Sequence, residues 1–384
     1  MNIQAGYNGL TTLTPGLPAD AYYSRRQYDL EMHRIWLRNW LYVGRSSEVA
    51  KSRSFATFEL GDQHILLVRD EQGVLRGFYN TCRHRGAQLC TEAHGTLRSN
   101  ALVCPYHAWV YSLDGTLLRT TSKITQQGFE LAHYSLYPVR VKEWRGFVYV
   151  ALTDSPPEFD SMWDVPVTQL DRWPLEELAV GHVMNRTIAC NWKIFWENYN
   201  ECLHCPSVHP QLSNLVPIYG RGLLEEQDDP QWQDHASSDD PRWKGGLRAG
   251  AKTWSLDGQV TGTAFSGLPE QDLKVGYTYM TGIPSTMIAA HADYVRVIRL
   301  LPLGPETTHM RVEYLFSKTI LMDQSANIRN AVDFTNTVLA EDADVCELTQ
   351  RGLHAAPHRR GVLMPEEYLL RQFHEWMERQ LAGV

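Results

Sequence analysis

The sequence predicts an α+β fold divided into two domains. Residues 55–150 contain short alternating runs of apolar and polar residues separated by Gly, Asp and Asn, a pattern typical of antiparallel strands. After a proline-containing acidic stretch at 153–166, helical and strand patterns are mixed in one long segment. Because 384 residues are enough for two hydrophobic cores, we expect a β domain over residues 42–155 and a second domain formed by residues 1–41 and 156–384.

Local patterns define the expected elements. Apolar residues recur at helical spacing over residues 22–41, which predicts an amphipathic N-terminal helix. The strands expected in the β domain are FATFEL, HILLVRD, LRGFYN, ALVCPYHAWVYS and GFVYVAL. The second domain should contain a helical segment at about 190–205, a polar, glycine-rich region at 220–270, and strands in YVRVIRLLPL and HMRVEYLFS. Two further helices are expected near 324–350 and 365–381.

Composition excludes several classes of protein. The apolar fraction of 43% and the charged fraction of 21% are those of an ordinary globular protein. A net charge of -8 without a Lys/Arg tract argues against a nucleic-acid partner. No run reaches the ~18 apolar residues of a membrane span, and the first residues lack an export signal, so we expect a cytoplasmic protein with no membrane association. Seven cysteines in such a chain favour metal ligation or burial over disulfides.

Two cysteine and histidine pairs form a candidate metal motif in the β domain. Cys82 and His84 are followed, after nineteen residues, by Cys104 and His107. Such a set of two cysteines and two histidines suits Zn²⁺, but zinc modules usually pair Cys with Cys and His with His along the chain. A Rieske [2Fe-2S] centre holds one iron by two Cys and the other by two His, so each loop must supply one of each. The mixed halves resemble the Rieske signature, including the glycine after the first half and the proline inside the second.

A second metal motif lies in the other domain. His204 and His209 are five residues apart, which does not place them on one face of a regular helix, but Pro206 should break the helix between them. Asp342 falls on the apolar stripe of the helix expected at 324–350. A carboxylate facing a core costs several kcal/mol unless it is paired or bound to metal. We therefore expect Asp342 to complete a facial triad with the two histidines, the alternative being an ordinary salt bridge.

These motifs together resemble the α (oxygenase) subunits of Rieske non-haem iron oxygenases. The segment Glu201-x2-His204-x4-His209 matches the family's acid-His-His motif, and residues 341–353 are similar to the stretch around its ligand Asp. The resemblance covers about residues 22–380. It implies an N-terminal Rieske β-domain and a C-terminal helix-grip-like catalytic domain built on an antiparallel sheet, with a [2Fe-2S] cluster and Fe(II) as cofactors. It also implies O2 and a small molecule as substrates, a separate flavin/iron-sulfur reductase, and a homotrimer in which each cluster lies beside a neighbour's iron.

Glu201 is where the sequence departs from most of the family. The resemblance implies that this acid accepts hydrogen bonds from His107 of one subunit and His204 of the next, so that it bridges the two metals. Most members have Asp here, and the Glu resembles the branch that acts on quaternary ammonium compounds such as betaines, carnitine and choline. The expected function is a monooxygenase reaction that hydroxylates an N-methyl group and leads to N-demethylation. Asn198, one turn before, either faces the iron or caps the helix.

Aromatic residues around the second motif are compatible with a cationic substrate. Each aromatic face contributes ~0.5 to 2 kcal/mol to binding a trimethylammonium group. The pocket candidates are Phe195, Tyr199, Tyr219, Trp254, Tyr277 and Tyr279.

Other functions stay open at this point. The same aromatic residues suit an aromatic-ring-hydroxylating oxygenase. A Rieske electron-transfer protein without catalysis would need only the β domain, and a zinc-stabilised binding module would contain no sulfide. Cys202 and Cys205 form a C-x2-C that suggests a zinc site or a redox pair, but neither explains Asp342 or the upstream motif.

Overall fold

The computed structural model describes residues 3–124 and 127–382. The chain folds into two compact units. One unit is Trp36–Met162, and the other consists of the chain before and after it. Each unit has its own sheet and its own metal motif.

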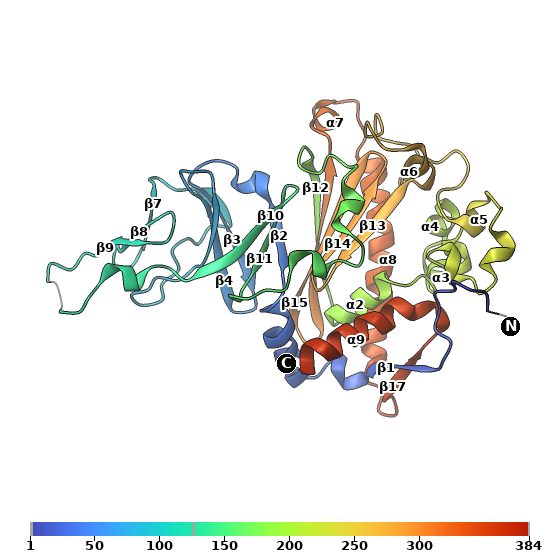
Figure 1. Ribbon diagram of the computed structural model, residues 1–384, viewed down its shortest axis with the longest axis horizontal. Helices are drawn as coiled ribbons and strands as arrows, with labels where there is room; N and C mark the ends of the chain where they lie inside the picture. The colour runs from blue at the N-terminus through green and yellow to red at the C-terminus, as the bar shows by residue number, and fades with distance from the viewer. Residues whose placement is uncertain (1–2, 125–126, 383–384) are drawn as a thin grey trace. The chain divides into compact units, whose positions relative to one another are not determined.

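The Trp36–Met162 unit is built from antiparallel strands (Figure 1). A seven-stranded sheet has the order β2-β11-β10-β5-β4-β3-β6, and a three-stranded sheet has the order β7-β8-β9. The strands are β2 Leu41–Arg45, β3 Ser54–Leu60, β4 Gln63–Arg69, β5 Leu75–Tyr79, β6 His94–Thr96, β7 Ala101–Val103, β8 Val110–Ser112, β9 Leu117–Arg119, β10 Pro138–Trp144 and β11 Phe147–Ala151. The expected strand ALVCPYHAWVYS is two strands, because the chain turns between β7 and β8.

The other unit has a five-stranded antiparallel sheet in the order β12-β16-β15-β14-β13. Its strands are β12 Ala179–Ile188, β13 Tyr277–Gly282, β14 Thr286–His291, β15 Tyr294–Gly304 and β16 Thr307–Phe316, with a separate pair of β1 Thr14–Pro18 and β17 Arg360–Leu363. The helices are α1 Arg25–Glu31, α2 Trp192–Tyr199, α3 Cys205–Val208, α4 Pro210–Leu215, α5 Pro241–Lys244, α6 Glu270–Val275, α7 Lys318–Met322, α8 Arg329–Leu353 and α9 Tyr368–Ala382. Helix α8 packs against α2 and β12. The α+β prediction with an antiparallel catalytic sheet is thus confirmed.

The helices near the second motif and at the N-terminus begin and end at other residues than expected. The segment expected at 190–205 is interrupted at Asn200, where α2 ends, and not at Pro206. Pro206 instead lies in the first turn of α3, where a missing backbone N–H costs nothing. The N-terminal helix is also shorter than expected: α1 ends at Glu31 and a wider helical turn follows over Met32–Trp36.

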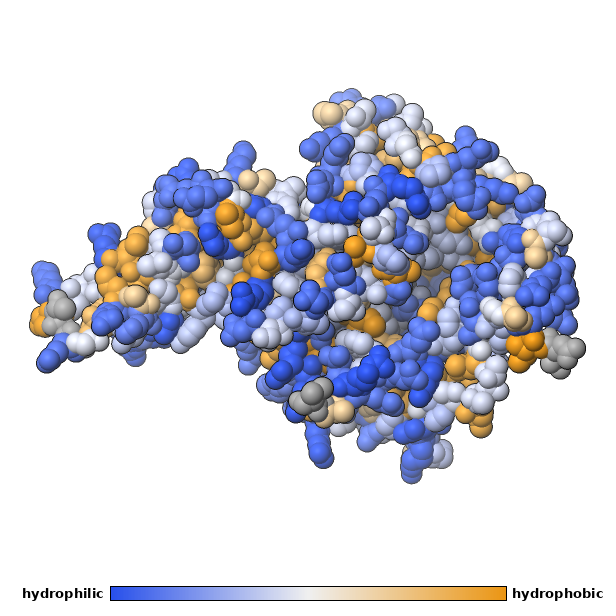
Figure 2. All heavy atoms as spheres, in the orientation of Figure 1, coloured by the Kyte–Doolittle hydropathy of each residue, from blue (hydrophilic) through white to orange (hydrophobic). Residues whose placement is uncertain are grey.

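Helix α9 covers α2 through a polar contact between His374 and Glu197. Hydrophilic side chains cover the visible side of α9 (Figure 2), while its Phe373 and His374 are buried. His374 Nε2 lies 2.9 Å from Glu197 Oε1 on α2, and the same oxygen accepts a hydrogen bond of 2.8 Å from the Tyr22 hydroxyl. This contact fixes α2, which carries Asn198 and Tyr199, against the C-terminal helix. No helix within residues 3–124 and 127–382 has the length and apolar character needed to cross a bilayer.

Candidate active site

The Cys/His motif of the β unit occupies two tight loops. Cys82 follows β5, and its backbone N–H donates to Ala87 O at 2.8 Å. Cys104 follows β7, and its N–H donates to Trp109 O at 2.8 Å. The second loop needs a left-handed residue, Ala108, at φ 50°. Each loop therefore turns back on its own cysteine and presents a histidine two or three residues later.

The four side chains pair as a Rieske cluster requires. Cys82 and Cys104 are buried, at 3% and 2% exposure, and their side chains contact each other. His84 Nδ1 and His107 Nδ1 lie 3.1 Å apart at the exposed end of the loops. Among the described residues, no three of these four donor atoms gather within 4.8 Å of one another, as one tetrahedral zinc ion would require. Two sulfurs on one side and two imidazoles on the other fit the two irons of a [2Fe-2S] centre.

A tyrosine hydroxyl supports the cysteine pair. Tyr111 Oη lies 3.2 Å from Cys82 Sγ and accepts a hydrogen bond of 3.1 Å from the backbone N–H of Arg83. When Cys82 is a thiolate, the hydroxyl has to be the donor to sulfur. Hydrogen bonds to cluster sulfurs favour the reduced state.

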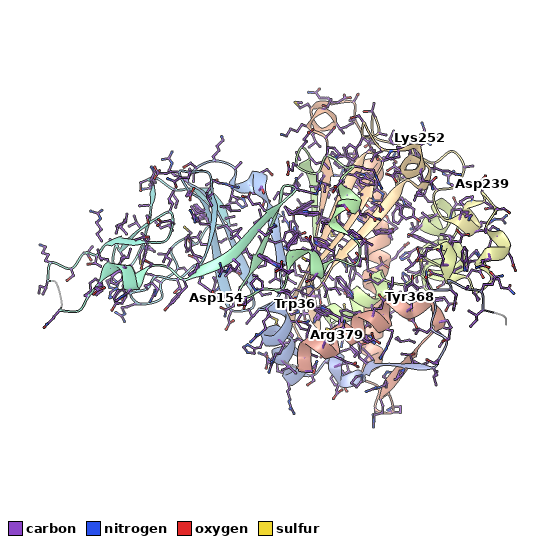
Figure 3. All side chains as sticks on the ribbon, in the orientation of Figure 1. Trp36, Asp154, Asp239, Lys252, Tyr368 and Arg379 are labelled. Carbon is purple, nitrogen blue, oxygen red and sulfur yellow. A yellow bond between two sulfur atoms is a disulfide. The ribbon has the colours of Figure 1, made fainter. Side chains whose placement is uncertain are left out.

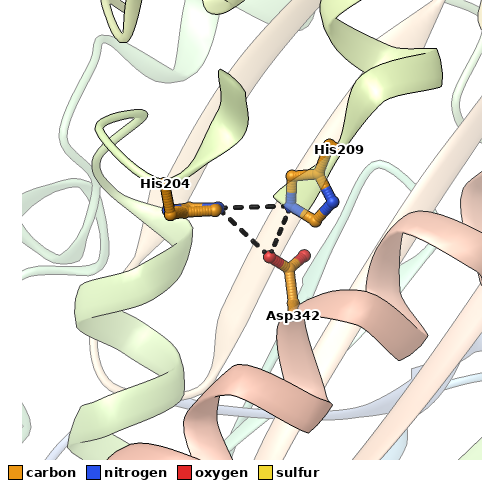
Figure 4. A group of neighbouring side chains, drawn as sticks. All are labelled: His204, His209 and Asp342. Carbon is orange, nitrogen blue, oxygen red and sulfur yellow. Dashed lines mark hydrogen bonds and ion pairs between the residues drawn. The ribbon is translucent and has the colours of Figure 1, made fainter. Parts of the chain in front are cut away.

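Three side chains of the second unit converge on one point (Figure 4). His204 precedes α3, His209 lies between α3 and α4, and Asp342 is in the middle of α8. The two Nε2 atoms are 3.2 Å apart. Asp342 Oδ1 lies 2.9 Å from Nε2 of His209 and 3.3 Å from Nε2 of His204.

Two further carboxylates determine which nitrogen of each histidine faces this point. His204 Nδ1 lies 2.5 Å from Glu201 Oε1, and His209 Nδ1 lies 2.8 Å from Glu341 Oε2. In the neutral imidazoles, each Nδ1 keeps its proton and donates it to a carboxylate, which leaves each Nε2 free to bind a metal ion. In this neutral form, two nitrogen lone pairs and one carboxylate oxygen face each other with no donor between them. This donor set fits a divalent metal of the iron type with open coordination positions.

The pKa shifts of the two histidines and of Asp342 show that this site attracts positive charge. Burial by itself lowers the pKa of His204, but hydrogen bonds to Asp342 and Glu201 outweigh it and raise the pKa to about 9. Burial by itself also lowers the pKa of His209, but the interactions with Asp342 and Glu341 outweigh it and raise the pKa. Burial by itself raises the pKa of Asp342, but hydrogen bonds from both histidines in their protonated form lower it. A metal ion would replace these protons.

Glu201 and Asn198 lie on the His204 side of the site. Glu201 accepts from the backbone N–H of Leu203 as well as from His204. Asn198 Nδ2 is 3.5 Å from both ring nitrogens of His204, too far for a strong hydrogen bond, and its Oδ1 is buried without a partner. Asn198 therefore faces the histidine.

A cavity of about 380 Å³ adjoins the triad and is lined mainly by aromatic and apolar side chains. Ring centroids of Trp254 lie 5.3 Å from Tyr277, 6.0 Å from Tyr279 and 6.2 Å from Tyr219. Its polar and aromatic lining includes Asp164, Asn198, Tyr199, Glu201, His204, His209, Tyr219, Trp254, Tyr277, Tyr279, Arg296, Asp342 and Tyr368. Five of the six pocket candidates are therefore brought together around the triad.

Phe195 is the exception among the pocket candidates. It is not among the described residues that line the cavity, and its side chain is fully buried one turn before Tyr199 on α2. The structure therefore does not bring this candidate to the cavity wall with the other five.

Several polar residues of the cavity were missed by sequence reasoning, among them Arg296, Asp164 and Tyr368. Arg296 lies within the apolar strand β15, and Asp164 lies in the stretch interpreted as a connection between domains. Tyr368 begins α9 (Figure 3). Arg296 had a signal, because it is the charge inside the run YVRVI, but the strand register is needed to see which way it points.

A disulfide is present, although metal ligation or burial was favoured for the cysteines from the sequence. Cys202 and Cys205 form a disulfide across the turn between Glu201 and α3. Their Cα atoms are 5.0 Å apart, because a C-x2-C in a helical turn brings two side chains to one side. Both are buried, and neither is available as a thiolate ligand in this form.

The fold and the two sites define an iron-dependent oxygenase that has a Rieske cluster unit and a separate catalytic unit. Comparisons with known proteins agree. Residues 39–130 match the Rieske [2Fe-2S] domain, and residues 172–383 match the ring hydroxylating alpha subunit (catalytic domain). The chain belongs to this family of Rieske non-haem iron oxygenases, whose cofactors are a [2Fe-2S] cluster and a non-haem iron.

Individual relatives match over nearly the whole chain. The glycine betaine monooxygenase oxygenase subunit of Chromohalobacter salexigens is 30% identical over 90% of this chain and 81% of its own. The chloroplastic choline monooxygenase of Beta vulgaris is 27% identical over 96% and 77%. The crystal structure of a quaternary ammonium Rieske monooxygenase in complex with L-carnitine superposes with a TM-score of 0.71 at 20% identity, covering 99% of both chains.

Proposed function

We propose that this enzyme is a monooxygenase that removes an N-methyl group from a small quaternary ammonium compound. The observation that carries this proposal is the aromatic cavity beside the triad. Four aromatic side chains, Tyr219, Trp254, Tyr277 and Tyr279, line the same cavity as His204, His209 and Asp342. The faces of such rings attract a trimethylammonium group, which cannot donate hydrogen bonds. The names of the relatives support the same substrate class.

In this proposal, His204, His209 and Asp342 hold Fe(II), and Cys82, His84, Cys104 and His107 hold the cluster. Iron supplies the activation of O2 that the oxygen insertion requires. The aromatic side chains place one N-methyl group toward the triad and exclude bulk water. Hydroxylation gives an N–CH2OH group, which loses its hydroxyl proton as the C–N bond breaks. The products are formaldehyde and the demethylated amine.

We further propose a homotrimer in which electrons pass between subunits through Glu201. The relatives are oxygenase subunits, so a separate reductase supplies the electrons. Glu201 Oε1 accepts from Nδ1 of His204. Its Oε2, which accepts from the backbone N–H of Leu203, has a further lone pair that is able to accept from the partner subunit's His107. The half-buried His107 at the end of its loop is compatible with such a contact.

The test is substrate-dependent formaldehyde release. The iron-loaded enzyme, a surrogate reductase and O2 are combined with glycine betaine, carnitine, choline or simple aromatic acids. We expect formaldehyde from at least one ammonium compound, in proportion to reductant consumed. Oxygenated product from an aromatic acid, with no formaldehyde from any ammonium compound, would replace this proposal by aromatic-ring hydroxylation.

Metal analysis separates an oxygenase from an electron carrier. A cluster together with a mononuclear iron gives three irons for every two labile sulfides. Equal amounts of iron and sulfide in fully loaded protein would mean that the second site is not an iron site.

A further inference from the structure

One cross-strand row of the catalytic sheet brings a buried arginine to the cavity. Tyr279 pairs with Ala289, Ala289 with Arg296, and Arg296 with Tyr314. Residues paired in this way point to the same face of the sheet. The small Ala289 leaves space beside Arg296, whose side chain reaches the cavity wall while the residue stays only 2% exposed.

The guanidinium of Arg296 lacks the partners that its burial demands. Its Nη2 donates to the Tyr199 hydroxyl at 3.1 Å, but its Nε and Nη1 have no acceptor. Within residues 3–124 and 127–382, it forms no ion pair with an acidic side chain. Lys193 shows the contrast, because this fully buried cation donates to both oxygens of Glu31 at 2.7 and 2.9 Å. A buried guanidinium without a carboxylate is costly unless a ligand supplies one.

A second unpaired donor lies beside it. The indole Nε1 of Trp254 is buried without an acceptor, and Arg296 Cζ lies 5.9 Å from the centroid of the same indole ring. Both residues line the cavity. Three donor nitrogens on two neighbouring side chains of the cavity lining therefore lack acceptors. Buried donors of this kind normally have partners, so their sharing one cavity points to an acceptor-rich ligand group.

We propose that Arg296 binds a carboxylate of the substrate, with the Trp254 indole N–H as a second donor. The substrate is then a zwitterion, whose ammonium group lies against the aromatic faces and whose carboxylate pairs with Arg296. A planar guanidinium fork matches a carboxylate with two parallel hydrogen bonds. For the ammonium half of the substrate, this inference rests on the proposed function. For the carboxylate half, it rests on the unpaired donors alone.

The arrangement also discriminates against simple cations. A quaternary ammonium compound without a carboxylate would leave the Arg296 guanidinium without a paired anion. A betaine brings its own counter-charge. Arg296 is therefore the specificity-determining residue that separates betaines from amino alcohols such as choline.

The first experiment measures binding to the wild-type holoenzyme by calorimetry without O2. The ligands are glycine betaine, its methyl ester, choline and benzoate. The ester retains the ammonium group and removes only the negative charge. We expect glycine betaine to bind roughly 10- to 100-fold more tightly than its ester or choline, as for a charge-assisted bidentate pair.

The second experiment repeats the titrations on Arg296→Met and Arg296→Lys. Methionine removes the charge, and lysine keeps the charge but not the fork. We expect Arg296→Met to remove the preference for glycine betaine while choline binds at least as well as before, and Arg296→Lys to give an intermediate preference. Arg311→Lys is the matched control, because Arg311 lies on β16 and pairs with Glu313. It should leave all four affinities unchanged.

The outcomes separate this inference from the proposed function. Equal binding of glycine betaine, its ester and choline by the wild type would overturn the role of Arg296 and leave the ammonium proposal standing. The same holds if Arg296→Met weakens all ligands equally. Binding of benzoate alone, lost in Arg296→Met, would support the carboxylate site and remove the ammonium proposal. Binding of no carboxylate by the wild type would overturn the inference.

Discussion

The histidines of the two metal sites lie in opposite electrostatic surroundings. In the Rieske unit, desolvation and the neighbouring His84 and Arg85 lower the pKa of His107. In the catalytic unit, hydrogen bonds to carboxylates raise the pKa of His204 and His209 in spite of their burial. The same side chain is thus surrounded by positive charge in one unit and by negative charge in the other.

The difference follows the charge that each site has to accommodate. A cluster becomes more negative when it is reduced, so donors such as the Tyr111 hydroxyl and nearby arginines stabilise its reduced state. A mononuclear divalent ion needs acceptors, and Glu201, Glu341 and Asp342 supply them. The comparison therefore predicts that removing a carboxylate damages the catalytic site and that removing a donor shifts the potential of the cluster.

The largest effect is expected for Asp342→Ala. The substitution removes the one carboxylate oxygen that faces both Nε2 atoms. The protein should lose its mononuclear iron and all oxygenase activity but keep its cluster, so that iron and sulfide become equal in analysis. Asp344→Ala is the control, because this exposed residue of the same helix pairs with Arg186. Retained mononuclear iron would show that another carboxylate is the ligand.

Glu201→Gln tests whether the carboxylate that holds Nδ1 of His204 takes part in electron transfer to the iron site. Both metals should stay bound, whereas product formed per cluster oxidised should fall by roughly 10- to 100-fold, the range for outer-shell partners of metal ligands. Rapid mixing of the reduced enzyme with substrate and O2 follows cluster oxidation and product together. The exposed Glu375→Gln on α9 serves as the control. Unchanged product yield in Glu201→Gln would remove this residue from the electron path.

Much of the contrast between the two metal sites could be predicted from the sequence, because most of their ligands lie close together in the chain. The strands of the β unit follow the alternation of apolar residues, and each Cys/His loop lies within a few residues of chain. The burial of Asp342 at 5% exposure agrees with its place on the apolar stripe of α8. His204 and His209 converge even though the helix break was expected at the wrong residue. The two short helices α3 and α4 bring them together in place of one kinked helix.

What the sequence did not reveal depends on tertiary structure. Glu341 falls off the apolar stripe of its helix, yet that position lets it reach Nδ1 of His209. Arg296 looked like any charge in a strand, because its direction depends on the register with Ala289 and Tyr314. Phe195 was placed in the pocket from its proximity in sequence alone.

Glu341→Gln should have a moderate effect on the catalytic site. Glutamine keeps the shape but removes the charge that orients His209 and strengthens it as a ligand. We expect the affinity for Fe(II) to fall roughly 10- to 100-fold, measured by titration of protein that retains its cluster but has been depleted of mononuclear iron. Glu347→Gln on the same helix, which accepts from the backbone of Ala189, is the matched control. Equal iron affinities in the two variants would show that the acidic surroundings of His209 have no effect on the metal.

The smallest effect is expected at the cluster, where Tyr111→Phe removes a hydroxyl 3.2 Å from Cys82 Sγ. A hydrogen bond of about 0.5 to 1.5 kcal/mol that favours the reduced state corresponds to roughly 20 to 65 mV for a one-electron couple. The potential of the cluster should fall by this amount, measured by redox titration of its visible absorption.

Tyr106→Phe provides the control for this shift. The Tyr106 hydroxyl belongs to the same pair of loops but lies 3.5 Å from Arg85 Nη1 rather than beside a sulfur. Its removal should leave the potential unchanged. Because Tyr111 is fully buried, thermal unfolding of both variants has to be compared. A shift of equal size in both variants would mean that general loosening of the loops, and not donation to Cys82, sets the potential of the cluster. The cluster would then not be stabilised by donors. The contrast in charge between the two metal sites would hold only for the acceptor-rich iron site of the catalytic unit.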